Sequence, residues 1–442
     1  MRRKSWSLLL VVLLLGLAGA SQAAPLVNCQ VELDRRVLLA GPTQKTVIKI
    51  ALDAPLMPRT DERSPVNLAL VLDRSGSMSG DKITKAREAA IEALHRLGST
   101  DLFSLVAYDH EVKTLVPAQR IKHGEGIEAQ IRRIQPGGNT ALFGAVSQGA
   151  AEVRKHSDSN YVHRVVLLSD GLANVGPSNP ADLARLGAAL LKEGISVTTV
   201  GVGTDFNEDL MTQLAERSDG NHYFVESSRD LPRIFAAELG DVLSVVARKV
   251  IIEIDCPPGV KPLRIIGREG RIKGQKVEVR MNQIYGGQQK YALVEVEVPV
   301  SQPGQQLDLA RVDCRYQNAL TDIDESSTTM ARTRFSQRPE EVRQAASKEV
   351  QKAVVENEMA VTRDRALNLY NAGRKDEAAR ALREKSDDLK EQNAALGFAD
   401  LAEEAGQLQD EATEFETNQL DKTRKKELRS ESFKVRKQQK AY

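Results

Sequence analysis

The sequence predicts a mixed α/β protein with a doubly wound, mostly parallel, Rossmann-like sheet. This sheet is inserted in, or followed by, a β-sandwich, and a helical hairpin lies C-terminal to both. Three observations support this fold class. Across residues 65–244, short β-rich apolar runs alternate with amphipathic helical segments. Residues 24–64 and 245–337 instead show the period-two alternation of exposed and buried positions in strands. Residues 338–420 are rich in Ala, Glu, Lys, Arg and Leu at helical spacing.

The composition is that of a folded protein with more than one domain. The chain has 442 residues, of which 41% are hydrophobic and 28% charged, so we expect two or three domains with aliphatic cores. The formal net charge is +1, so nothing in the overall charge indicates a nucleic-acid partner.

Residues 1–23 have the pattern of a secretory signal peptide. Three basic residues at 2–4 precede an apolar run over residues 8–18, and small residues follow up to Ala23, after which we expect cleavage. The alternative is an uncleaved membrane anchor, but the apolar run is shorter than the roughly 20 residues that a membrane span requires. The sequence therefore predicts a secreted or periplasmic protein.

Export would place the three cysteines, Cys29, Cys256 and Cys314, in a compartment that favours disulfides. Because three is an odd number, at least one of them lacks an intramolecular partner. Cys256 and Cys314 lie in the same strand-rich segment and are the preferred pair, although the sequence does not fix the connectivity. No CxxC or Cys/His grouping indicates zinc.

Residues 65–244 predict a parallel sheet covered by helices on both faces. The apolar strand runs include 67–72, 102–108, 165–168 and 197–202, with helical segments at 83–97 and 183–191 between them. Continuous apolar strands separated by helices are typical of such sheets.

The two flanking segments predict one β-sandwich. Alternating residues such as Val277, Val279 and Met281 predict strands, and Gly and Pro turns separate them. The few strands in residues 24–64 would be marginally stable alone, so we expect them to join the later ones.

The C-terminal region predicts a helical hairpin or bundle over residues 338–420, followed by a basic tail. Residues 371–373 form a helix stop, and Asp376 can start the next helix. Residues 421–442 are strongly basic. We interpret them as a frayed, solvated tail; the alternative is a contact with the cell envelope or another anionic surface.

The candidate ligand-binding residues follow predicted strands or tight turns. Asp73, Ser75 and Ser77 follow the strand at 67–72, and Gly76 permits a tight turn between the two serines. Thr140 ends a glycine-rich turn that precedes a helix.

Asp170 also follows a strand, at residues 164–169. Ligand sites in doubly wound sheets lie at the carboxyl ends of strands, so five oxygen-bearing side chains from three loops should converge there.

The pattern D-x-S-x-S, then a Thr after a Gly-rich turn, then S-D-G resembles the metal-ion-dependent adhesion site of von Willebrand factor A (VWA) domains. The resemblance covers roughly residues 65–244, and no motif position departs from it. It implies that Ser75, Ser77 and Thr140 coordinate Mg²⁺ or Mn²⁺, with Ca²⁺ as a further option. It also implies that Asp73 and Asp170 act largely through ordered water.

The chemistry of these side chains agrees with such a role. Hard cations prefer oxygen ligands and often retain water. Neutral hydroxyls leave the charge of the ion poorly compensated, so a partner's Asp or Glu carboxylate can replace a water. The sequence therefore predicts an exported, non-enzymatic, cation-dependent protein-binding protein that acts in adhesion or assembly.

Three alternatives remain at this point. The hydroxyls could merely cap the following helix, which would make the site structural. The chain could be an accessory VWA subunit that regulates an enzyme or transport complex. It could also be a metal-assisted hydrolase anchored by Asp73 and Asp170, but no separate general base is evident.

Asp109 and His110 could border the site, or could be plain surface.

Overall fold

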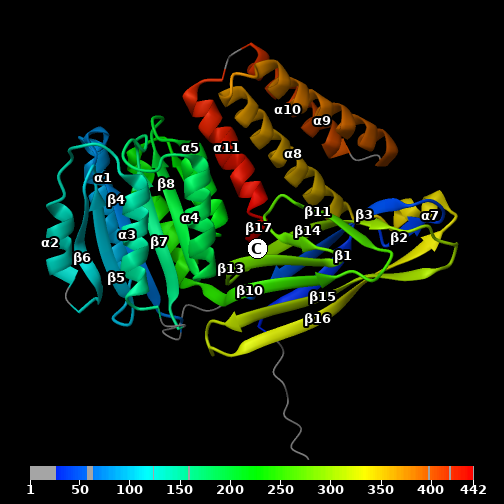
Figure 1. The fold of residues 1–442 in the computed structure, drawn as a ribbon, viewed down its shortest axis with the longest axis horizontal. Helices are drawn as coiled ribbons and strands as arrows, with labels where there is room; N and C mark the ends of the chain where they lie inside the picture. The colour runs from blue at the N-terminus through cyan, green and yellow to red at the C-terminus, as the bar shows by residue number, and fades with distance from the viewer. Residues whose placement is uncertain are drawn as a thin grey trace, which may run out of the picture.

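The computed structural model describes residues 26–56, 63–122, 124–157, 160–396, 399–417 and 420–441. They form an α/β domain, a β-sandwich and a layer of C-terminal helices (Figure 1). The fold class predicted from the sequence is confirmed. The predicted signal peptide at residues 1–23 lies outside the described residues.

The α/β domain is built on a six-stranded sheet with the order β6-β5-β4-β7-β8-β9. All neighbouring strands are parallel except β5 and β6, so the sheet is mostly parallel with one antiparallel edge. The strands are β4 (Val66–Asp73), β5 (Leu102–Tyr108), β6 (Val112–Arg120), β7 (Val162–Ser169), β8 (Ile195–Val202) and β9 (His222–Val225).

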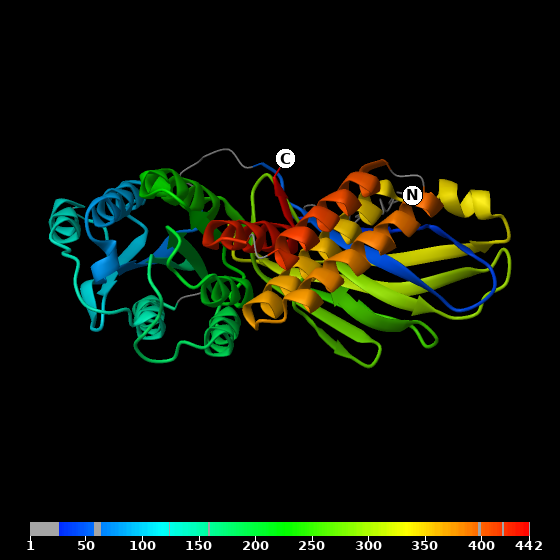
Figure 2. The ribbon, with the colours of Figure 1, turned by 90° about the horizontal axis from the view of Figure 1, so that it is seen from above.

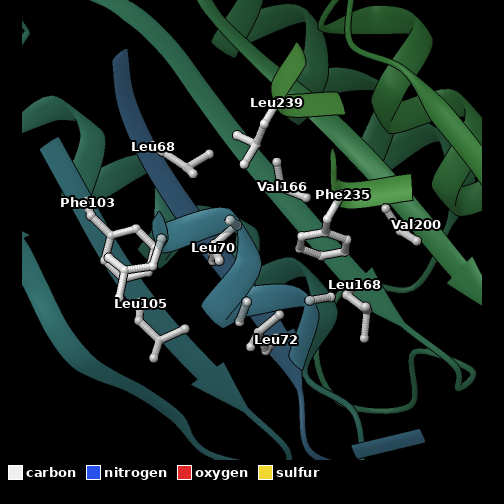
Figure 3. Packing of buried hydrophobic residues seen from close by; sticks show 14 of the residues in the cluster. Leu68, Leu70, Leu72, Phe103, Leu105, Val166, Leu168, Val200, Phe235 and Leu239 are labelled. Atoms are coloured by element: carbon white, nitrogen blue, oxygen red, sulfur yellow. The ribbon is translucent and has the colours of Figure 1, made fainter. Parts of the chain in front are cut away.

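Helices cover both faces of this sheet, which explains why its central strands are apolar along their whole length. Alternate residues of β4 point to opposite faces: Leu68, Leu70 and Leu72 belong to the same buried cluster as Phe235 and Leu239 (Figure 3), and the residues between them enter a second core. One face carries α1 (Asp81–His95), α2 (Gly124–Arg132) and α6 (Leu231–Leu243); the other carries α3 (Leu142–Arg154), α4 (Pro180–Lys192) and α5 (Glu208–Arg217).

The β-sandwich combines both flanks of the α/β domain, which is therefore inserted between its strands. One sheet has the order β1-β3-β14-β11, with β17 also paired to β14, and the other has the order β12-β13-β10-β15-β16-β2. The N-terminal strands are β1 (Asn28–Leu33), β2 (Val37–Leu39) and β3 (Gln44–Asp53). The later ones are β10 (Val245–Asp255), β11 (Lys261–Ile266), β12 (Arg271–Lys273), β13 (Lys276–Tyr285), β14 (Gln288–Val298), β15 (Gln306–Asn318) and β16 (Asp324–Ser336).

The preferred disulfide between Cys256 and Cys314 is wrong. Cys314 on β15 bonds to Cys29 on β1, and Cys256 is a buried free thiol. The N-terminal strands return to the sandwich after the whole α/β insertion, so the partner of Cys314 lies 285 residues away in sequence. Proximity along the chain was therefore a poor guide to the pairing.

The C-terminal helices extend beyond the single hairpin expected. A short helix, α7 (Pro339–Gln344), precedes α8 (Lys348–Asn371), and a turn then leads into α9 (Lys375–Leu396). The next helix is α10 (Ala399–Glu416). Helix α8 rests on the outer face of the sandwich, where Ala353 packs against Tyr291 and Leu293.

The interpretation of residues 421–442 as a frayed, solvated tail is wrong. They form α11 (Lys422–Arg436) and the short strand β17 (Gln439–Ala441). Figures 1 and 2 show α11 lying between the α/β domain and α8. Its basic residues are largely paired inside the molecule: Lys426 bonds to Glu208, and Arg429 to Asp209. A sequence pattern does not show these partners, because they lie about 220 residues earlier in the chain.

In the part of the chain that the structure describes, none of the helices combines the length and apolarity needed to cross a membrane.

Candidate metal-ion site

The site begins where β4 ends. Asp73, the last residue of the strand, is fully buried. Its Oδ1 accepts a hydrogen bond from the Ser75 backbone N–H at 2.8 Å, and its Oδ2 accepts one from the Ser169 hydroxyl at 2.6 Å. Asp73 therefore ties the first loop to the end of β7.

Two serines of the first loop join this anchor to Asp170. The Oγ atoms of Ser75 and Ser77 are 3.1 Å apart, and the Ser77 hydroxyl donates to Asp170 Oδ1 at 2.6 Å. Ser75 and Asp170 are both buried. The D-x-S-x-S loop and the S-D-G loop thus meet at one point of the sheet edge.

The glycine-rich turn brings Thr140 to the same point. The Gly76 N–H donates to Gly138 O at 3.1 Å, and the Gly137 N–H donates to Arg74 O at 2.7 Å, so backbone bonds join this turn to the first loop. The Thr140 N–H donates to Asn174 Oδ1 at 2.8 Å, and the Thr140 carbonyl accepts from the Asn174 N–H at 3.1 Å. Thr140 is consequently buried and fixed from both sides.

The three hydroxyls converge above Gly171. A Cβ atom at this glycine would lie 3.1 Å from Thr140 Oγ1, 3.4 Å from Ser77 Oγ and 3.8 Å from Ser75 Oγ. The absence of a side chain at Gly171 therefore leaves a small space that faces all three oxygens. We call this space the hydroxyl cradle.

The charges around the hydroxyl cradle are only partly balanced. Burial raises the pKa of Asp73 to about 6, although hydrogen bonds from Ser169 and Ser75 oppose the increase. Lys82 lies on α1, and its Nζ is 2.5 Å from Asp170 Oδ2. The lysine offsets one of the two carboxylates, so a divalent cation here would not be fully neutralised by the protein.

The donor set fits a hard divalent cation. Three hydroxyls and two carboxylates are all oxygen ligands, which Mg²⁺, Mn²⁺ and Ca²⁺ prefer. Over the described residues, no group of three or more His, Cys, Asp or Glu side chains forms an alternative metal site. All five side chains singled out from the sequence, namely Asp73, Ser75, Ser77, Thr140 and Asp170, lie in this one arrangement.

Asp109 supports the site from behind. Its carboxylate pairs with Arg74 at 2.8 Å, and its backbone carbonyl accepts from the Ala141 N–H at 2.8 Å. His110 is more than half exposed and lies beside Gly138. Asp109 thus holds the loops that carry Ser75 and Thr140, rather than lining the cradle.

Sequence reasoning missed three further residues of the site. Lys82 and Ser169 bond to the side chains of Asp170 and Asp73, and Asn174 bonds to the backbone of Thr140. Ser169 had a usable signal, since it stands directly before Asp170 in the S-D-G segment. Lys82 and Asn174 had none, because their partners are 88 and 34 residues away along the chain.

The hydroxyl cradle opens into a cavity of about 660 Å³. The three loops that carry the five predicted side chains line one part, and the loop between β8 and α5 lines another. Lys422, Lys425 and Lys426 of α11 also face this cavity. The C-terminal helix thus borders the site, which the sequence did not indicate.

The comparisons with known proteins identify the domain that carries this site. Residues 67–237 match the family model described as the von Willebrand factor type A domain. An uncharacterised protein of Synechocystis is 26% identical over 293 residues, covering 64% of this chain and 69% of that protein. YfbK of Escherichia coli is 26% identical over 232 residues, covering 52% of this chain and 40% of that protein. The matched region thus spans less than half the length of the second relative.

Two solved structures share the fold over most of the chain. A von Willebrand factor type A protein from Catenulispora acidiphila has a TM-score of 0.68 at 18% identity, covering 88% of this chain and 89% of that one. The ArnB paralog VWA2 from Sulfolobus acidocaldarius has a TM-score of 0.64 at 16% identity, covering 93% and 98%. These likenesses extend the shared fold to the additional sheets and the C-terminal helices. VWA domains typically bind a divalent metal and mediate protein–protein interactions.

Proposed function

Because residues 67–237 match the von Willebrand factor type A domain, we propose that this chain is an exported, cation-dependent protein-binding protein rather than an enzyme. Ser75, Ser77 and Thr140 would hold Mg²⁺ or Mn²⁺ directly. Asp73 and Asp170 would orient its remaining waters. A carboxylate from a partner protein would complete the coordination, and the outcome would be adhesion or assembly.

The observation that carries this proposal is the convergence of three hydroxyls above Gly171. Hydroxyls that merely cap a helix would bond to its first backbone N–H groups. Ser75 instead precedes the short helix Gly76–Met78 without making a side-chain cap bond, and the N-cap of α1 is Gly80, which has no side chain. The hydroxyls of Ser75 and Ser77 face each other, and Ser77 also bonds to Asp170.

The charge of the site supports a carboxylate ligand. A bound divalent cation would supply a coordination position for an incoming carboxylate. The residues around the cation would neutralise its charge only in part, because the hydroxyls are neutral and Lys82 already pairs with Asp170. The burial of Asp73 and Asp170 also weakens the screening of these charges by water.

Two observations support export. The basic and apolar pattern of residues 2–18 is that of a signal peptide, and the disulfide between Cys29 and Cys314 suits an oxidising compartment. We therefore propose that the mature chain acts in the periplasm or outside the cell.

The proposal is tested by calorimetric titration of the mature protein with Mg²⁺ and Mn²⁺. Wild type should bind one ion, whereas Thr140→Ala should lose a ligand and bind at least tenfold more weakly. Gly171→Ala should also weaken binding, because the new methyl group would occupy the cradle within 3.1 Å of Thr140 Oγ1.

Gly240→Ala is the matched control for the glycine substitution. It lies on α6, and a Cβ atom there would meet nothing within 4 Å. Its ion affinity should equal that of wild type. A wild-type protein that binds neither cation, or a Thr140→Ala variant with unchanged affinity, would contradict the proposed metal site.

A further inference from the structure

The C-terminal helix forms part of the wall of the cavity into which the hydroxyl cradle opens. Lys422, Lys425 and Lys426, which we call the lysine wall, line the same cavity as Ser77 and Thr140. Figure 1 shows α11 standing beside α5 of the α/β domain. The ligand space is therefore composite, because one part comes from the VWA domain and another from a helix near the end of the chain.

The lysine wall is held in place by buried contacts. Lys426 is buried, and its Nζ donates to the Phe206 carbonyl at 2.7 Å and to Glu208 at 2.6 Å. One turn further along α11, Arg429 is also buried and bonds to Asp209 at 2.6 Å and to Asp364 on α8 at 2.9 Å. These bonds fix α11 to the loop beside the hydroxyl cradle, so its lysines face the cavity without any rearrangement.

Two lysines of the wall are available to a ligand. Lys425 is half-buried over the ring of Tyr370, with Nζ 4.8 Å from the ring centre. Among the described residues, no carboxylate lies within ion-pairing distance of Lys425. Lys422 pairs with Asp205 at 2.9 Å, but the two side chains are 71% and 65% exposed. Such exposed pairs contribute little and exchange readily for a ligand carboxylate.

The acidic residues of the cavity are already neutralised. Glu208 pairs with Lys426, Asp209 with Arg429 and Asp205 with Lys422, so Lys425 is the lysine of the wall whose charge no described carboxylate offsets. A divalent cation in the hydroxyl cradle would therefore leave the cavity with an excess of positive charge, to which Lys425 adds. Leu172, which follows Gly171, is 58% exposed and offers an apolar contact in the same cavity.

We propose that this cavity binds an acidic segment of a partner protein that presents at least two carboxylates. One carboxylate completes the coordination of the metal ion, and another lies against Lys425 and Lys422. This inference rests on the proposed function, since the first carboxylate requires the ion. The lysine wall determines which carboxylate-bearing segments bind, while the hydroxyl cradle determines whether any binds.

The test compares two fluorescent peptides of equal length with the full mature chain loaded with Mn²⁺. One peptide carries a single Glu in a Gly/Ser background, and the other carries four successive Glu residues. Fluorescence anisotropy should show tighter binding of the four-glutamate peptide by wild type. Lys425→Ala should weaken that binding by about fivefold, and the double variant with Lys422→Ala should weaken it further. Both variants should bind the single-glutamate peptide and Mn²⁺ itself as wild type does.

Lys434→Ala is the matched control, because Lys434 is an exposed lysine of the same helix that does not line the cavity. It should retain the preference of wild type. Binding that persists in a chelator would show simple charge attraction to the lysines and would overturn the inference.

Equal affinities of wild type and the double variant for the four-glutamate peptide, or no preference between the peptides, would also overturn it. If Mn²⁺ binding is intact in that case, the proposed function stands without the inference. A wild-type chain that fails to bind Mn²⁺ removes both.

Discussion

The buried carboxylate of Asp73 destabilises the folded protein when no metal ion is bound. Burial raises its pKa to about 6, above the value of about 4 in an unfolded chain. The folded state therefore binds a proton more tightly than the unfolded state, so stability falls as pH rises from about 4 through 6. At pH 7 the buried carboxylate costs on the order of 3 kcal/mol.

We therefore expect Asp73→Asn to unfold at a higher temperature than wild type at pH 7.5 in the presence of a chelator. The neutral amide can still accept from the Ser75 N–H, and it avoids burial of a charge. The difference should shrink at pH 5, where Asp73 is protonated in wild type. Thermal unfolding at both pH values measures this. A variant that is less stable than wild type by the same amount at both would contradict the argument.

At the level of single residues, the five oxygen-bearing side chains could be predicted from the sequence because each follows a strand or a tight turn. A strand end fixes the position of the next few residues, whatever the rest of the chain does. Lys82 and Asn174 stand only five residues after Ser77 and four after Asp170, but neither belongs to the pattern, and their partners, Asp170 and Thr140, lie in other loops. The pairing of Cys29 failed for the same reason, because it depends on where β1 lies in the sandwich.

Strand β9 and helix α11 meet through a buried histidine. The His222 ring packs edge-on against Phe433 of α11, with 5.7 Å between ring centres, and its Nδ1 lies 2.9 Å from Thr199 Oγ1. Burial and, to a smaller extent, the nearby cations Lys426, Lys434 and Arg429 together lower the pKa of His222 to about 3. The folded protein thus keeps this histidine neutral far below the ordinary pKa of about 6.5.

Because the pKa of His222 is lower in the folded state, its contribution to the free energy of unfolding is fully present above pH 6.5. That contribution is lost as pH falls toward 3. Between pH 6.5 and 5, the loss should be about 2 kcal/mol. His222→Gln should remove this dependence of the free energy of unfolding on pH. The difference in that free energy between wild type and the variant should therefore narrow on acidification. Urea unfolding at pH 7, 6 and 5 measures it, and other titrating groups cancel in the comparison. Parallel pH profiles would refute the assignment.

At the scale of elements, local periodicity was enough to predict the alternating strands and helices of the α/β domain. Each of these elements buries an apolar face, and that requirement shows in its own residues. Helix α11 lacks such a face. Its core-facing positions include Lys426 and Arg429, which are buried through ion pairs with Glu208 and Asp209. A basic segment of this kind resembles a solvated tail until its acidic partners are placed beside it.

The three parts of the molecule meet at one buried carboxylate. Asp219 follows α5, and its carboxylate accepts from Lys290 of the sandwich at 3.0 Å and from Lys437, just after α11, at 3.2 Å. Arg268 approaches it at 3.4 Å, and the Asn282 N–H donates to it at 2.7 Å. Burial alone would raise the pKa of Asp219, but these cations hold it well below its ordinary range.

We expect Asp219→Asn to destabilise the whole molecule by about 3 to 5 kcal/mol, since it leaves buried cations without their counter-charge. Asparagine tolerates the left-handed backbone at this position, where φ is 54°, so the effect is electrostatic rather than conformational.

Asp230→Asn is the control, because Asp230 forms only an exposed pair with Arg233 and should change stability by less than about 1 kcal/mol. Calorimetry of both variants separates two outcomes. If Asp219 joins the three parts, its loss should lower the transition temperature and split one transition into several. A single transition at the wild-type temperature would mean that the parts are held together elsewhere, for example through Arg164, which bonds to Gln283 and Tyr285 across the same junction.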